Sequence, residues 1–96
     1  MVTIGMNYFV IPGKETVFEA AVAKVVDTMK GIGGHAESHL YKEIGDAEPA
    51  YLIVSRWEDE DAFRSFVASD AFKKVTSWGK ENILSRRPSH TTYQEG

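Results

Sequence analysis

The hydrophobic period of the chain changes from two residues to the helical period after residue 11, and this change limits the possible folds more than any other feature. Residues 2–11 read VTIGMNYFVI, and their even positions form one fully apolar face of a predicted strand. Pro12 and Gly13 end that strand, because proline lacks the ladder donor and glycine permits a turn. The apolar residues that follow keep helical spacing: Phe18, Val22, Val25, Val26 and Met29. They predict an amphipathic helix of about four turns from residue 14, ended by the glycines at 31, 33 and 34.

The rest of the chain predicts three more strands and one or two short helices. Residues 35–44 alternate loosely and residues 50–57 (AYLIVSRW) are strongly β-like, so the polar segment 45–49 between them favours a hairpin turn. Four acidic residues at 58–61 precede apolar residues at helical spacing, as at a helix start. Ser69 is the predicted N-cap of a second short helix, and residues 90–94 predict a last strand.

This order, β-α-β-β-α-(α)-β, predicts a ferredoxin-like α+β fold, an antiparallel sheet with helices on one face. Our assignment gives the even-numbered residues 2–10 to the uncovered face and turns Asn7 and Phe9 toward the helices. The uncovered face would then be too apolar for a monomer, and we expect a homodimer that packs sheet against sheet.

Composition excludes several classes of protein. The 96 residues predict a single domain over 1–96, and the absence of cysteine excludes disulfides and Cys-based zinc sites. A net charge of −3 without long runs of one sign gives no electrostatic case for nucleic acid or an anionic membrane as partner. The apolar runs are too short for a transmembrane helix and no secretory signal pattern is present, so we expect a cytoplasmic protein.

One segment carries a family resemblance. Trp57 to Lys73, WEDEDAFRSFVASDAFK, with an asparagine on the first strand and a tryptophan closing the third, resembles the antibiotic biosynthesis monooxygenase family. The resemblance spans nearly the whole chain and implies a dimeric α/β barrel with a pocket in each subunit between sheet and helices. It implies cofactor-free oxidation of polycyclic phenols and quinols, or the haem chemistry of another branch. Many relatives in the family have no known activity.

The haem-degrading branch can be compared residue by residue. Its first-strand asparagine is matched by Asn7, whereas Phe66 stands where that branch has a tryptophan. Its iron-ligating histidine would fall at or near Thr76, in a segment without histidine. Two of the three residues therefore differ from the pattern of the haem-degrading branch. The phenol-oxidising branch resembles this chain in using an asparagine and a tryptophan around a pocket.

Asn7 is the predicted catalytic residue, because an amide in an apolar pocket can stabilise developing negative charge. Its structural alternative is a hydrogen bond to neighbouring backbone or side chains. The predicted substrate-binding residues, each with an alternative as ordinary core or surface, are Phe9, Trp57, Phe63, Phe66, Thr76 and Trp78. Three arginines, at positions 56, 86 and 87, are candidates to hold a carboxylate, with solvent-exposed roles as the alternative.

The histidines give no metal cluster. His35 and His39, four apart on one predicted strand, would share a face at about 13 Å, too far apart for joint ligation. His39, or His35, is the candidate ligand for a haem iron, and a solvent-exposed strand histidine is the alternative, as it is for His90.

The sequence thus predicts a homodimeric pocket protein that binds a planar, mostly apolar molecule, with no cofactor required or with haem. As an enzyme it would let O₂ react directly with an electron-rich phenol or quinol, or act on haem. The alternative is a non-catalytic dimer that binds haem or another hydrophobic molecule. In a third possibility the pocket is filled by Phe9, Trp57, Phe63 and Phe66.

Overall fold

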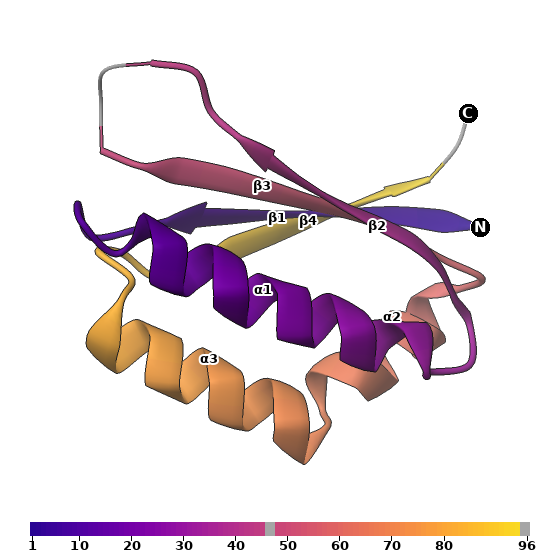
Figure 1. The fold of residues 1–96 in the computed structure, drawn as a ribbon. Coiled ribbons are helices and arrows are strands. Elements are labelled where there is room, and N and C mark those ends of the chain that lie inside the picture. The colour runs from indigo at the N-terminus through magenta and orange to yellow at the C-terminus, as the bar shows by residue number, and fades with distance from the viewer. Residues whose placement is uncertain (46–47, 95–96) are drawn as a thin grey trace.

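Residues 1–45 and 48–94, which the computed structural model describes, form a four-stranded antiparallel sheet with three helices on one face (Figure 1). The elements in chain order are β1 (Val2–Phe9), α1 (Glu15–Lys30), β2 (His35–Lys42), β3 (Ala50–Trp57), α2 (Glu60–Val67), α3 (Asp70–Asn82) and β4 (Ser89–Gln94). The strand order β2-β3-β1-β4 is that of a ferredoxin-like α+β fold, so the predicted fold is confirmed. The predicted turn at 45–49 includes residues 46 and 47, which lie outside the described residues.

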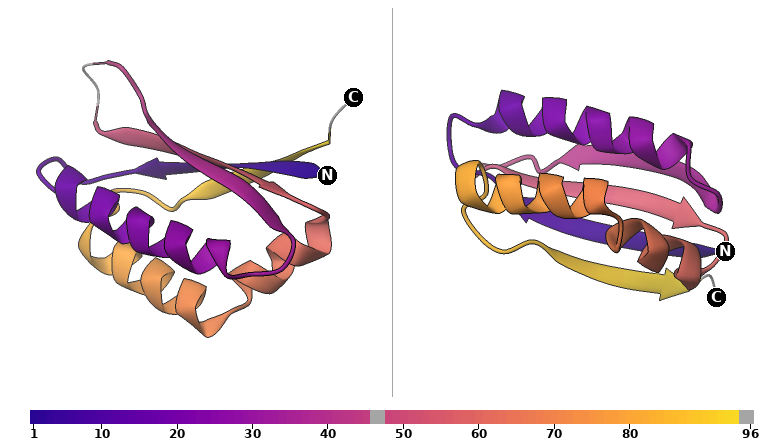
Figure 2. Two further views of the ribbon diagram at one scale, coloured as in Figure 1. Left: turned by 45° about the vertical axis from the view of Figure 1, so that its right-hand side comes forward. Right: turned by 90° about the horizontal axis from the view of Figure 1, so that it is seen from below.

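The two C-terminal helices begin at side-chain caps. Asp59 Oδ1 accepts a hydrogen bond from Ala62 N at 2.9 Å, and Ser69 Oγ accepts one from Phe72 N at 3.2 Å, which confirms the predicted cap. α1 and α3 run side by side across the sheet (Figures 1 and 2). No helix within the described ranges has the length and hydrophobicity needed to cross a membrane.

The faces of β1 are the reverse of our assignment. Ile4 and Val10 are fully buried under the helices and Met6 is 4% exposed, whereas Asn7 is exposed on the opposite face. The physical reason is that an unbroken apolar stripe buries more area against the helices than the face that carries Thr3, Gly5 and Asn7. The predicted inward orientation of Asn7 and Phe9 was therefore wrong.

A β-bulge separates the faces of His35 and His39. The pairing of β2 with β3 shifts between His35 and Glu37, and one extra residue reverses the alternation that follows. His35 consequently packs on the helix side, with its ring 4.9 Å from that of Trp57, while the exposed His39 lies on the other side. The prediction that the two histidines share a face was wrong.

The sheet face away from the helices, here called the open face, is uncovered (Figure 2). Leu52 and Val54 of β3 lie half-buried on it, between the exposed tyrosines Tyr41 and Tyr93, which are 54% and 56% exposed. The open face is thus mixed in character rather than the continuous apolar surface that we expected.

Candidate functional site

An apolar cavity lies between the sheet and the helices α1 and α3. Its volume is about 50 Å³. Most of its lining is aliphatic or aromatic: Phe18, Val22 and Val25 from α1, Ile53 from β3, and Phe72 and Val75 from α3. Tyr8 of β1 and Thr76 and Trp78 of α3, which carry polar groups, also line it. We call this space the inner cavity.

A second cavity, the outer cavity, lies between β1, β4 and the helices α2 and α3 and has a volume of about 260 Å³. Four residues line both spaces, which places the two cavities side by side: Met6, Tyr8, Phe72 and Thr76. The remainder of the outer lining combines apolar residues such as Phe63 with the basic side chains of Lys80, Arg87 and His90. The site therefore has an apolar interior and a basic mouth.

Tyr8 lines both cavities, and its hydroxyl has a weak hydrogen-bond partner. Its Oη donates to Met6 Sδ at 3.7 Å, and a thioether is a weak acceptor. Burial raises the pKa of Tyr8 to about 12, so the phenol stays protonated at neutral pH. The site thus offers a hydrogen-bond donor to any ligand oxygen that reaches it.

The rings of Phe18 and Tyr51 form an aromatic wall next to Tyr8. The ring of Tyr8 lies 5.4 Å from the ring of Phe18, which lies 4.6 Å from that of Tyr51. Tyr51 Oη donates to Glu19 Oε2 at 2.5 Å, and burial, followed by this carboxylate, raises the pKa of Tyr51. The hydrogen bond between β3 and α1 holds the wall in place, which fixes the position of the Tyr8 ring.

The structure brings three of the predicted substrate-binding residues to these cavities. Thr76 and Trp78 line the inner cavity, and Thr76 and Phe63 line the outer one. Trp57 and Phe66 belong to the hydrophobic core beside it, with exposures of 0% and 2% and ring centroids 5.5 Å apart. The ring of Trp57 packs edge-on against Phe63 at 5.8 Å, and that of Phe66 packs edge-on against Phe72 at 5.0 Å.

The other three predicted residues lie across the sheet, on the open face. Asn7 borders an open pocket of about 400 Å³ beside Tyr41, and Phe9 lies beneath the guanidinium of Arg86 at 4.4 Å. His39 Nε2 lies 3.5 Å from Glu37 Oε2 at the surface. The sheet thus separates these side chains from the inner and outer cavities.

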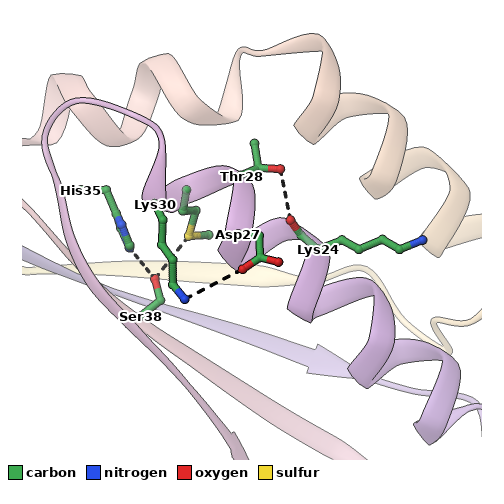
Figure 3. Close-up of polar contacts among 7 residues, drawn as sticks. Lys24, Asp27, Thr28, Lys30, His35 and Ser38 are labelled. Carbon is green, nitrogen blue, oxygen red and sulfur yellow. Dashed lines mark hydrogen bonds and ion pairs between the residues drawn. The ribbon is translucent and has the colours of Figure 1, made fainter.

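His35 is held in a small polar cluster at the end of α1 (Figure 3). Its Nε2 lies 2.7 Å from Ser38 Oγ, which donates to Met29 Sδ at 3.2 Å, while Lys30 pairs with Asp27 nearby. Burial lowers the pKa of His35, so the ring is neutral at pH 7. The described part of the chain contains no group of three or more His, Asp or Glu side chains placed to hold a metal ion.

Sequence reasoning missed Met6, Tyr8 and Lys80 as site residues, and it considered His90 only as a candidate haem ligand. The signal for the first pair was present, because an unbroken apolar stripe with one tyrosine belongs against helices. Lys80 lies one helical turn after Thr76, and this spacing puts both on one face of α3. His90 needed the register of β4 opposite Met6, which the sequence does not display.

Two solved structures share this fold. A conserved protein from Methanosarcina mazei is 19% identical, with a TM-score of 0.87 over 99% of this chain and 92% of that chain. SnoaB from Streptomyces nogalater, named as a cofactor-independent oxygenase, is 21% identical, with a TM-score of 0.83 over 99% of this chain and 92% of that chain. At such identities the likeness establishes the fold alone.

A curated relative and a family model match the sequence of this chain. A protein of Natronomonas pharaonis named "Putative heme-binding protein" is 34% identical over 88 residues, which is 92% of this chain. The chain spans only 14% of that relative's length. The model of the family described as "Antibiotic biosynthesis monooxygenase" matches residues 1–78. With most of its length matched and the fold in agreement, the chain belongs to the antibiotic biosynthesis monooxygenase family.

Proposed function

We propose that this chain binds a planar, mainly apolar phenol or quinol in the inner and outer cavities and oxidises it with O₂ without a resident cofactor. The observation that carries the proposal is that Tyr8 lines the apolar cavity with a protonated hydroxyl whose acceptor among the described residues is a thioether. A shared fold with a protein named as a cofactor-independent oxygenase supports it.

The sizes of the cavities indicate where such a ligand would lie. A space of about 50 Å³ holds a few water molecules, so a fused-ring molecule would need both cavities together. Trp78 borders the inner cavity and is 43% exposed, which leaves its side chain room to move aside. We therefore place the ring at the shared lining formed by Met6, Tyr8, Phe72 and Thr76.

The chemistry requires only that the ligand itself supply the electrons. In anthrone, for example, a CH₂ group becomes C=O while the second oxygen atom of O₂ leaves with both hydrogens as water. Transfer of a proton from the ligand to a solvent water at the outer cavity gives its enolate or phenolate and starts the reaction, and a hydrogen bond from Tyr8 Oη would stabilise the resulting oxyanion. The apolar walls would orient the ring and exclude water. Tyr8 thus takes the role that the sequence assigned to Asn7.

The test is anthrone oxidation in air, followed by anthraquinone absorbance and by incorporation of ¹⁸O from ¹⁸O₂. We expect turnover above the protein-free rate, and Tyr8→Phe should lower kcat by about 100-fold, the usual loss for one oxyanion donor. Tyr41→Phe, the same change on the open face, is the matched control and should keep the wild-type rate. Turnover that survives in Tyr8→Phe but is lost in Asn7→Ala would instead return the role to Asn7.

Haem binding without oxidation is the second candidate, favoured by the name of the curated relative. The inner cavity fits haem poorly, because it is small and has no histidine in its lining. The predicted ligand His39 lies across the sheet, whereas His90 lines the outer cavity. A haemin titration of the wild type decides between the candidates. A saturable Soret shift near one equivalent per chain, without anthrone turnover, would replace the oxygenase proposal with haem binding, and His39→Ala and His90→Ala would assign the ligand.

The proposal includes a homodimer formed through the open face. Its half-buried Leu52 and Val54, with the exposed rings of Tyr41 and Tyr93, supply apolar surface at the centre of a sheet that no helix covers. A symmetric partner would cover this face and leave the basic mouth, on the helix side, open to ligand.

A further inference from the structure

We propose that the ligand of this site is a fused-ring aromatic acid whose carboxylate is held at the mouth of the outer cavity by Lys80 and Arg87. This inference rests on the proposed function, because it assumes that the ring occupies the two cavities. It adds the chemical class of the ligand and the residues that select it.

The distribution of charge is the first observation. The chain has 14 Asp and Glu residues against 11 Lys and Arg, yet among the described residues the outer cavity is lined by Lys80, Arg87 and His90 and by no acidic side chain. Lys80 comes from α3, Arg87 from the segment before β4, and His90 from β4 itself. Two separate segments therefore bring the positive charges of Lys80 and Arg87 to one opening, with the sign that an anion requires.

The ion pairs of neighbouring residues are the second observation. Arg86, next to Arg87 in the chain, forms an ion pair with Glu48 and stacks over Phe9. Within residues 1–45 and 48–94, no such ion pair involves Lys80 or Arg87. Their charges therefore remain available to a ligand, whereas that of Arg86 is already compensated.

The position of these charges relative to the apolar lining is the third observation. Phe63 and Phe72 line the same outer cavity as Lys80 and Arg87, and Phe72 also lines the inner cavity. Pro88, which follows Arg87 and is part of the lining, fixes its own φ and limits how the chain can turn into β4. A ligand with its ring on the two phenylalanines would therefore present its substituent to the basic mouth.

The test uses 2-naphthoate and 2-naphthamide, which have nearly the same shape and differ in charge. Isothermal titration calorimetry measures both affinities, and ¹H–¹⁵N spectra locate the shifted residues. We expect the wild type to bind the naphthoate about tenfold more tightly than the amide, a preference that falls at high salt. The double variant Lys80→Gln/Arg87→Gln should lose this preference while its affinity for the amide stays within about twofold.

The control is Lys14→Gln/Lys73→Gln, which removes the same charge from positions outside both linings and should keep the preference. Equal binding of both compounds by the wild type would overturn the anion site and leave the apolar cavity proposal standing. A preference that persists in Lys80→Gln/Arg87→Gln would overturn the assignment of these residues. Binding of neither compound would contradict the proposed function as well.

Discussion

At the scale of single residues, Ser55 shows that a polar atom in the core needs a hydrogen-bond partner. Ser55 is fully buried, and its Oγ accepts a hydrogen bond from Nε1 of the equally buried Trp57 at 3.0 Å. Ser55→Ala would leave the indole N–H without this acceptor, so we expect the free energy of unfolding to fall by about 1–3 kcal/mol. Urea denaturation measures this change, with Ser77→Ala on the exposed side of α3 as the control. Equal stabilities of the two variants would contradict the importance of this hydrogen bond.

The same core residues show which site residues a sequence can reveal. Trp57, Phe63 and Phe66 are recognisable as buried from their spacing, and all three are in the core cluster. Phe63, Thr76 and Trp78 line a cavity, and for Phe63 this place follows from helical spacing, whereas Thr76 was named through the family resemblance. Their role in binding stays a prediction. Asn7 and Phe9 do not line these cavities, since a strand has only two faces and both faces of β1 carry apolar residues.

At the scale of elements, Gly34 determines how α1 can pass into β2. Its φ is +91°, and a Cβ at this position would lie 2.5 Å from the Cβ of Ala62 on α2. Gly34→Ala therefore combines backbone strain with overpacking, and we expect a loss of at least about 2 kcal/mol in the free energy of unfolding. Gly33→Ala is the matched control, because nothing lies within 4 Å of its Cβ position, and it should stay within about 0.5 kcal/mol of wild type.

Thermal and urea denaturation of both variants measure the difference. A Gly34→Ala protein as stable as Gly33→Ala would mean that α2 shifts freely away from this turn. Activity gives a second readout, because α2 carries Phe63 into the outer cavity. We expect a rise in KM for anthrone in Gly34→Ala and none in Gly33→Ala.

The elements were more predictable than their faces. Ala50–Trp57 was predicted with its observed bounds, and the first strand was predicted to run beyond Phe9 because Val10 and Ile11 continue its alternation. In the structure Val10 only bridges to Leu84. The bulge at His35/Glu37 leaves no sequence signal that we could use, yet it decides which side His39 occupies. Lys80, Arg87 and His90 come together through tertiary packing, which a local sequence pattern does not encode.

At the scale of the whole molecule, the exposed surface is the argument for the proposed dimer. The chain exposes 6163 Å². A folded monomer of this mass is expected to expose about 5,500 Å². Part of the exposed surface is the open face. There the side chains of Leu52 and Tyr93 lie next to Gly5, and Val54 is opposite Gly5 on β3. A second copy of the same face is a self-complementary partner for such a surface.

Val54→Glu tests this dimer, because two-fold symmetry would bring two new carboxylates into the interface, where both would lose hydration. Sedimentation equilibrium should give twice the chain mass of 10.7 kDa for the wild type and the chain mass for the variant. Ala23→Glu, on the exposed side of α1, is the control and should remain dimeric. A monomeric wild type, or a Val54→Glu variant that remains dimeric, would contradict the interface.

Because the open face and the cavities lie on opposite sides of the sheet, the affinity for 2-naphthoate should not change when the dimer dissociates. A loss of affinity in the monomer would mean instead that the partner helps to shape the site through the sheet.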